Sequence, residues 1–352
     1  MEIPILSSYL VAMSISCLFF VLPLTASHVN AEQDAYTEAY DRGDYATAYQ
    51  VLQPLINKED PNAMFRLGCL YYYGKGVSQS YSESLKWFHK SAGKGNARAM
   101  YAIAGQYYQG KGIAQNYSEA LKWYGVAAEK GEADAMDIIG VMYELGKGQN
   151  QDYAEALKWF SRAAEKESAG GMINIGTLYA EGKGVEKDYH EAMKWFKKAF
   201  NAKGGAAAST NIGLMYFRGD GVEKDYSEAS KWFQIGAEKG VAPAMAQLGF
   251  MYDSGLGGKQ DYSEALKWSR MAADKGEVLG MTNLASMYAR GVGVPQDYEV
   301  ALKWYLTAAE KGDIIGMKAL GKIYYEGLGV PKDENEASKW YRRAGEQEQK
   351  GR

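Results

Sequence analysis

The eight tryptophans of this 352-residue chain are spaced almost evenly. Each follows a lysine, and each step is 36 residues except one of 37 between Trp195 and Trp232. The positions are Trp87, Trp123, Trp159, Trp195, Trp232, Trp268, Trp304 and Trp340. A fixed period of this length is typical of one supersecondary unit stacked on copies of itself. The spacing therefore predicts a repeat protein.

Each period contains two helical patterns separated by a glycine-rich break. In one copy, Ile103 and Tyr107 share a helix face, and Ala120 and Trp123 share another one further along the chain. Residues 110–113, Gly-Lys-Gly-Ile, interrupt the pattern between them. We therefore expect each unit to be a helix A, a glycine turn and a helix B, in an all-α fold.

Capping residues agree with this division. A glutamate stands three residues after a Ser, Asn or Asp at the expected start of nearly every helix B, where the cap side chain can accept from a free backbone N–H. These residues are Ser80, Asn116, Asp152, Asp188, Asp225, Asp261 and Asp333, whereas Asp297 is followed by Val300 instead. Helix B is expected to end at the Lys-Gly pairs, because glycine adopts the left-handed conformation easily.

Helix A carries a small residue at one repeated position. It is glycine or alanine throughout: Gly68, Ala104, Gly140, Gly176, Gly213, Gly249, Ala285 and Gly321. Glycine inside a helix costs up to about 1 kcal/mol relative to alanine, so this choice predicts that helices A and B approach closely. We expect the tryptophans to form the core, because burying one indole is worth roughly 4 to 6 kcal/mol.

These residues resemble the Sel1-like repeats, a family related to the tetratricopeptide repeat. The pattern is matched by "AMDIIGVMYELGKGQNQDYAEALKWFSRAAEK" (residues 135–166) and by "MTNLASMYARGVGVPQDYEVALKWYLTAAEKG" (residues 281–312). The resemblance implies a right-handed α-solenoid of eight repeats over residues 61–347, with helix A lining a concave face. Residues 32–60 are expected to be a degenerate N-terminal repeat or cap, and residues 348–352 a polar tail.

Residues 1–31 have the character of a signal peptide. An apolar run from Ile3 to Leu24 is followed by Val29-Asn30-Ala31, a small-x-small cleavage pattern. The run is also long enough for an uncleaved N-terminal membrane anchor. Export predicts a periplasmic or secreted protein.

Composition and motifs argue against several functions. A net charge of -3 does not favour nucleic-acid binding. Gly-Lys-Gly is no P-loop, and His89 and His190 belong to no catalytic string. We therefore expect no enzyme activity, no catalytic residues, no cofactor and no metal. One subgroup of the resembling family is linked to β-lactams, but its paired cysteines are absent here.

A candidate partner-binding surface lies on helix A. Carboxamides stand before the core aliphatic residue in four successive units, at Asn174, Asn211, Gln247 and Asn283. Such groups suit the amides or terminal carboxylate of a peptide, although a polar residue there can also simply face solvent. Aromatic side chains expected nearby are Tyr72, Tyr108, Phe217, Phe250 and Tyr325.

These observations favour an exported scaffold that binds a protein or peptide through its concave helix-A face. The family resemblance leaves two alternatives open. One is a β-lactam-binding or cell-wall-active hydrolase. The other is a secreted virulence factor that engages host proteins.

Overall fold

The computed structural model describes residues 30–350, and these residues are almost entirely helical. They form eighteen α-helices and one short 3-10 turn, with no strand in that range. The chain divides into two compact units between Lys187 and Asp188, each of which we describe by itself. The expected signal peptide or anchor, residues 1–31, lies outside the described residues apart from its last two.

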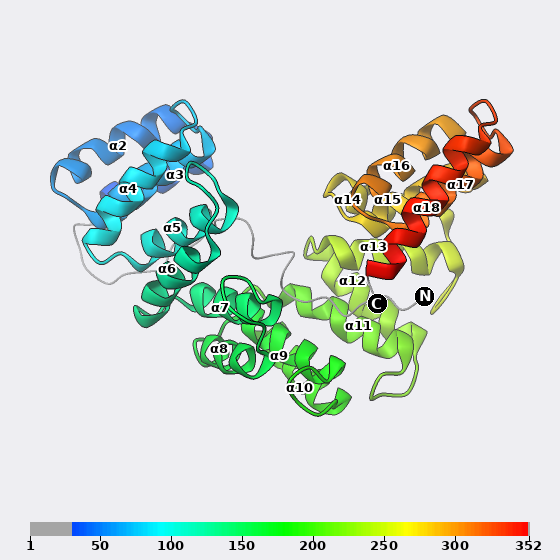
Figure 1. Cartoon of the computed structure of the whole chain (residues 1–352), viewed down its shortest axis with the longest axis horizontal. Helices are drawn as coiled ribbons and strands as arrows, with labels where there is room; N and C mark the ends of the chain where they lie inside the picture. Colours follow the sequence, from blue (N-terminus) through cyan, green and yellow to red (C-terminus); the bar gives the residue numbers. More distant parts are fainter. Residues whose placement is uncertain (1–29, 351–352) are drawn as a thin grey trace. The chain divides into compact units, whose positions relative to one another are not determined.

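In its described residues, the N-terminal unit contains nine helices, of which the first eight form four antiparallel hairpins (Figure 1). Their bounds are α1 (Asn30–Asp41), α2 (Tyr45–Asn57), α3 (Pro61–Tyr73), α4 (Tyr81–Gly93), α5 (Ala97–Gln109), α6 (Tyr117–Glu129), α7 (Ala133–Leu145), α8 (Tyr153–Glu165) and α9 (Ala169–Glu181). Odd-numbered helices from α3 onward are helices A, and even-numbered ones are helices B. The all-α helix-turn-helix repeat predicted from the period is confirmed.

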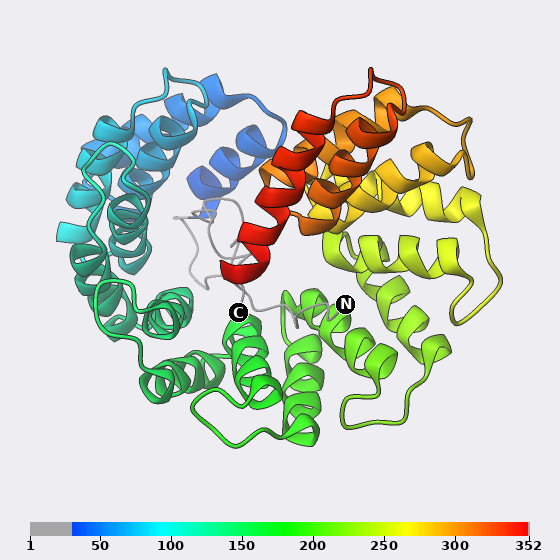
Figure 2. The same ribbon diagram turned by 45° about the vertical axis from the view of Figure 1, so that its right-hand side comes forward.

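The C-terminal unit continues the same alternation (Figure 2). Its helices are α10 (Tyr189–Asn201), α11 (Ala208–Arg218), α12 (Tyr226–Glu238), α13 (Ala242–Ser254), α14 (Tyr262–Asp274), α15 (Val278–Arg290), α16 (Tyr298–Glu310), α17 (Ile314–Glu326) and α18 (Glu334–Lys350). The short turn η2 (Gly205–Ala207) precedes α11. It takes up the extra residue of the 37-residue step, as expected for an insertion between helices.

The predicted caps of helix B are present. Asp152 Oδ1, for example, accepts from the backbone N–H of Glu155 at 3.0 Å. The glutamate side chain then meets the lysine that precedes the tryptophan, as in Lys194–Glu191 at 2.8 Å. Asp297 still caps through the N–H of Val300 at 2.9 Å. The cap and the i,i+3 ion pair together stabilise the first turns of helix B.

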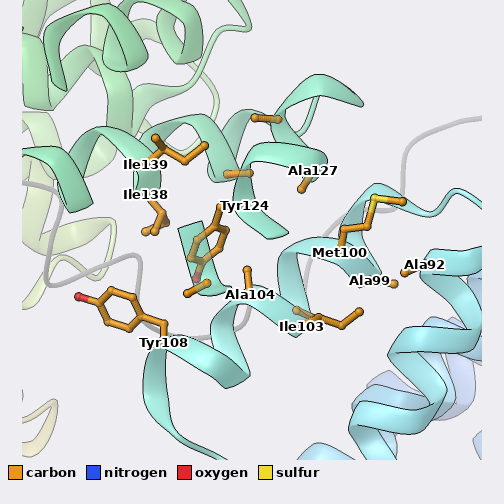
Figure 3. Close-up of a cluster of buried hydrophobic side chains, with 14 of the residues drawn as sticks. Ala92, Ala99, Met100, Ile103, Ala104, Tyr108, Tyr124, Ala127, Ile138 and Ile139 are labelled. Carbon is orange, nitrogen blue, oxygen red and sulfur yellow. The ribbon is translucent and has the colours of Figure 1, made fainter. Parts of the chain in front are cut away.

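The close approach of helices A and B is confirmed at the small residue of helix A. A Cβ added at Gly140 would lie 2.5 Å from the Phe160 ring, and one added at Gly213 would lie 2.5 Å from the Phe233 ring. Figure 3 shows the related arrangement in α5 and α6, where the Tyr124 ring lies between Ala104 and Ile138. A methyl group fits beside some rings, but not beside these phenylalanines.

The prediction that the tryptophans form the core is wrong for most of them. Trp268 and Trp340 are buried, whereas the other six indoles are half-buried at the rim of the core. The fully buried ring belongs to the next residue, as in Phe88, Phe160 and Phe233. Several of the indole rings are instead covered by a lysine or arginine side chain from three residues further along the helix. Arg162, for example, lies 4.2 Å from the centroid of Trp159.

The glycine turn between helices A and B also packs against the preceding repeat. Gly112 has φ +73, and a Cβ there would lie 2.6 Å from the Cβ of Tyr81 in the helix B before it. Glutamine before the cap closes the turn, because Gln115 Nε2 donates to the Tyr108 carbonyl at 2.8 Å. The Gly-Lys-Gly sequence is therefore explained by packing between successive repeats.

Candidate functional site

Neighbouring helices A contact one another directly in both units. In the N-terminal unit α7 contacts α9, and in the C-terminal unit α13 contacts α11 and α15. Neighbouring helices B make fewer such contacts among the described residues. In these pairs the helices A lie closer together than the neighbouring helices B. We call the surface that the helices A form the helix-A face.

The carboxamides predicted to bind a partner connect neighbouring helices A. Asn174 is 1% exposed and donates through Nδ2 to Asp137 Oδ1 at 2.8 Å. Asn283 is half-buried and donates to the Ala246 carbonyl at 3.0 Å. Each bond joins residues 37 positions apart, which is one repeat plus one residue. These amides hold one helix A in register with the previous one.

The other two carboxamides are buried as well. Asn211 is 1% exposed and Gln247 is 3% exposed. Gln247 Oε1 accepts no hydrogen bond from the described residues. A direct binding role for the four amides stays a prediction, and the contacts of Asn174 and Asn283 are with the protein's own helices.

The two aromatic residues predicted in the N-terminal unit are buried between repeats. Tyr72 is 4% exposed, and its hydroxyl donates to Gln109 Oε1 at 3.0 Å and accepts from Lys111 Nζ at 3.1 Å. Tyr108 is similarly buried and packs edge-on against Tyr117 at 5.1 Å between centroids. Both rings face the glycine turn of the following repeat.

The aromatic residues predicted in the C-terminal unit are more accessible. Phe217 and Phe250 are half-buried, and their ring centroids are 6.2 Å apart across α11 and α13. Tyr325 on α17 is 53% exposed, with Lys332 Nζ 5.1 Å from its centroid. Of the nine predicted partner-binding residues, Tyr325 therefore offers the largest exposed ring.

Sequence reasoning missed an ion pair on the same face. Arg290 Nη2 on α15 donates to both carboxylate oxygens of Asp253 on α13, at 2.8 and 2.7 Å. The two residues are 37 positions apart, the offset that also joins the amides to their acceptors. Comparing residues at that offset along the sequence would have shown the pair.

A buried carboxylate on α7 was also missed. Glu144 is 6% exposed, and the nearest cation is Lys183 Nζ at 3.9 Å. Lys183 lies closer to Glu181, at 2.6 Å. Burial raises the pKa of Glu144, with Lys183 lowering it and Glu181 raising it further.

The remaining candidates for chemistry named from the sequence are histidines. His89 packs at 5.3 Å from the Trp123 ring, and burial lowers its pKa. Within residues 30–350, no group of three or more His, Cys, Asp or Glu side chains is arranged to hold a metal ion. In the same part of the chain, no helix has the length and apolar character needed to cross a membrane.

The stacked hairpins and the repeated inter-helix contacts define an α-solenoid of two-helix repeats. Eight matches to the Sel1 repeat model cover residues 61–96, 97–132, 133–168, 169–203, 206–241, 242–277, 278–313 and 314–348. The chain belongs to the Sel1 repeat family. Proteins of this family are typically scaffolds for protein–protein interaction and generally lack enzymatic activity.

Solved structures of Sel1 repeat proteins are similar to this chain. The protective antigen c5321 of uropathogenic Escherichia coli is 28% identical, with a TM-score of 0.56, over 91% of this chain and 77% of that one. A Sel1 repeat protein from Oxalobacter formigenes is 32% identical, with a TM-score of 0.58, over 70% of this chain and 96% of that one.

A curated relative is similar over a short region. The ERAD-associated E3 ubiquitin-protein ligase component HRD3A of Arabidopsis thaliana is 30% identical over 76 residues. The match spans 21% of this chain and 11% of the relative.

Proposed function

We propose that this protein is an exported scaffold that binds a segment of a protein partner on the helix-A face of its C-terminal unit. The observation that carries the proposal is the exposure of Tyr325, which is 53% accessible on a helix A. Phe217 and Phe250 add half-buried aromatic surface on α11 and α13. Exposed and half-exposed aromatic rings are typical anchors of protein interfaces.

The carboxamides enter this proposal as positioning residues. Asn283 holds α15 in register with α13, which keeps the face of the C-terminal unit stiff before a partner arrives. Asn174 makes the corresponding bond within the N-terminal unit. A preformed surface loses little conformational entropy on binding, so less affinity is lost to ordering. Asn211 and Gln247, at the equivalent positions of α11 and α13, are assigned the same role.

Binding is tested with partners captured by proximity labelling in the native host and then purified. The double variant Phe250→Ala with Tyr325→Ala is expected to raise the dissociation constant for the captured partner at least tenfold, which is about 1.4 kcal/mol. Met271→Ala removes an exposed apolar side chain from helix B α14 and serves as the matched control. If both variants bind the partner as tightly as the unmodified protein, the helix-A face is not the binding surface.

Export rests on the apolar run Ile3–Leu24 and the small residues after it. Amino-terminal sequencing of the protein recovered from the periplasm or culture medium should begin at Glu32. An intact amino terminus in the membrane fraction would instead support the anchor.

A further inference from the structure

The last helix of the C-terminal unit leaves exposed an aromatic ring whose equivalents in earlier repeats are buried. Tyr341 on α18 is 44% exposed. Its equivalents one or more repeats earlier are 0 to 7% exposed: Phe88, Tyr124, Phe160, Phe233 and Tyr305. No described helix follows α18. The exposure of Tyr341 shows that α18 presents, in the described part of the chain, a surface that earlier repeats use to contact the next repeat.

The neighbouring residue shows how that contact is completed elsewhere. Arg270 stands two repeats before Arg342, and its Nη2 donates to the Tyr288 hydroxyl on the following helix A at 2.6 Å. Arg342 is 73% exposed, and the acid nearest to it is Glu346 at 3.9 Å. In α14, the arginine at this repeat position therefore reaches the next helix A.

The first described helix presents a matching charge. On α1, Asp34, Glu38 and Asp41 are exposed and lie at i, i+4 and i+7, so they form one stripe. Tyr36 and Ala39 are buried on the opposite side. Helix α1 contains no lysine or arginine, and no described helix precedes it.

We propose that α18 of one molecule packs against α1 of a second copy, head to tail. Tyr341 is buried in the contact, and Arg342 pairs with the acidic stripe Asp34, Glu38 and Asp41. The contact continues across two molecules the stacking of helix B on the next helix A that each unit already uses. Because the two surfaces differ, association yields a ring or a linear chain of copies.

Sedimentation velocity on the full chain, as it is recovered from cells, tests the proposal. The sedimentation coefficient is expected to rise with protein concentration, and to rise less in about 0.5 M than in about 0.05 M NaCl because salt screens exposed charges. Arg342→Glu is expected to weaken association about tenfold, as is the double variant Asp34→Lys with Glu38→Lys. Combining the three substitutions restores opposite charges and should bring association back to within about threefold of the original protein.

Lys197→Glu is the matched control, because Lys197 occupies the position of Arg342 in α10 and is exposed. It should leave association unchanged, and the helical circular dichroism of every variant should match the original protein. A monomer at all concentrations would overturn the proposal, as would charge reversals that have no effect or a combined variant that is not restored. A protein that stays monomeric could instead show a melting temperature that falls in the charge-reversed variants and recovers in the combined variant. That result would place the contact within one chain and would also overturn the proposal.

Discussion

At the scale of single residues, the glycine of helix A is set by the ring that faces it. Gly140→Ala is expected to destabilise the protein, because the added Cβ would lie 2.5 Å from the buried Phe160 ring. The higher helix propensity of alanine, worth up to about 1 kcal/mol, opposes this but does not relieve the clash. The midpoint of urea unfolding measures the net effect.

Gly125→Ala is the control for that substitution. Gly125 lies inside helix B α6, and a Cβ added there would meet no other atom within 4 Å. Alanine there should stabilise the protein by roughly 0.5 to 1 kcal/mol. If both substitutions shift the midpoint in the same direction, the contact with Phe160 does not explain the small residue.

The sequence predicted this close approach, but the separate prediction that the tryptophans form the core was wrong for most of them. Trp159 and Phe160 are adjacent and both apolar, so periodicity alone could not decide which one points at helix A. Size favoured the indole, whereas the phase of the helix turns Phe160 inward and leaves Trp159 at the rim. An offset of one residue, about 100° around a helix, separates the two positions.

At the scale of the element, α7 has buried or largely buried carboxyl groups at both of its ends. Burial is the main cause of the raised pKa of both Glu132, at its start, and Glu144, near its end. A raised pKa in the folded state means that the ionised form is penalised there. These two carboxyls should therefore add stability as the pH falls from about 7 to about 5, and remove it as the pH rises through their folded-state pKa. His89, whose pKa is lowered by burial, contributes the opposite dependence as the pH falls.

Glu144→Gln tests this dependence. The substitution should raise the urea midpoint relative to the unmodified protein by more at about pH 7 than at about pH 5. Glu165→Gln, at an exposed position on α8, should change the midpoint at neither pH. The chosen range avoids the acid region where Glu59, whose pKa is lowered by Lys94, loses its bond. An unchanged slope in Glu144→Gln would contradict the assignment.

The helices themselves were predictable from the sequence, and the contacts between equivalent helices were not. Caps such as Asp152 act over three residues, so they can be read locally. The bond from Asn174 to Asp137 joins residues 37 apart, and it depends on how far one repeat is rotated from the next. The carboxamide row was correctly placed on helix A, but its partners required the structure.

At the scale of the whole molecule, position in the array decides how much a ring contributes. Phe160 is fully buried, and Phe160→Ala should cost about 3 to 5 kcal/mol. Tyr341 fills the same place in the last repeat but is 44% exposed, so Tyr341→Ala should cost under about 1.5 kcal/mol. Urea unfolding of dilute protein measures both. Equal losses would mean that the exposed end is covered in solution.

The loop glycines carry a consequence for how such a chain can change over generations. Gly112 meets Tyr81, and Gly148 meets Tyr117, so each loop is fitted to the repeat behind it. A duplicated repeat would find on both flanks the surfaces for which it is already shaped. Recombination can thus lengthen or shorten the gene by whole modules without inventing a new junction, whereas a shift of a few codons would misalign every glycine beyond it.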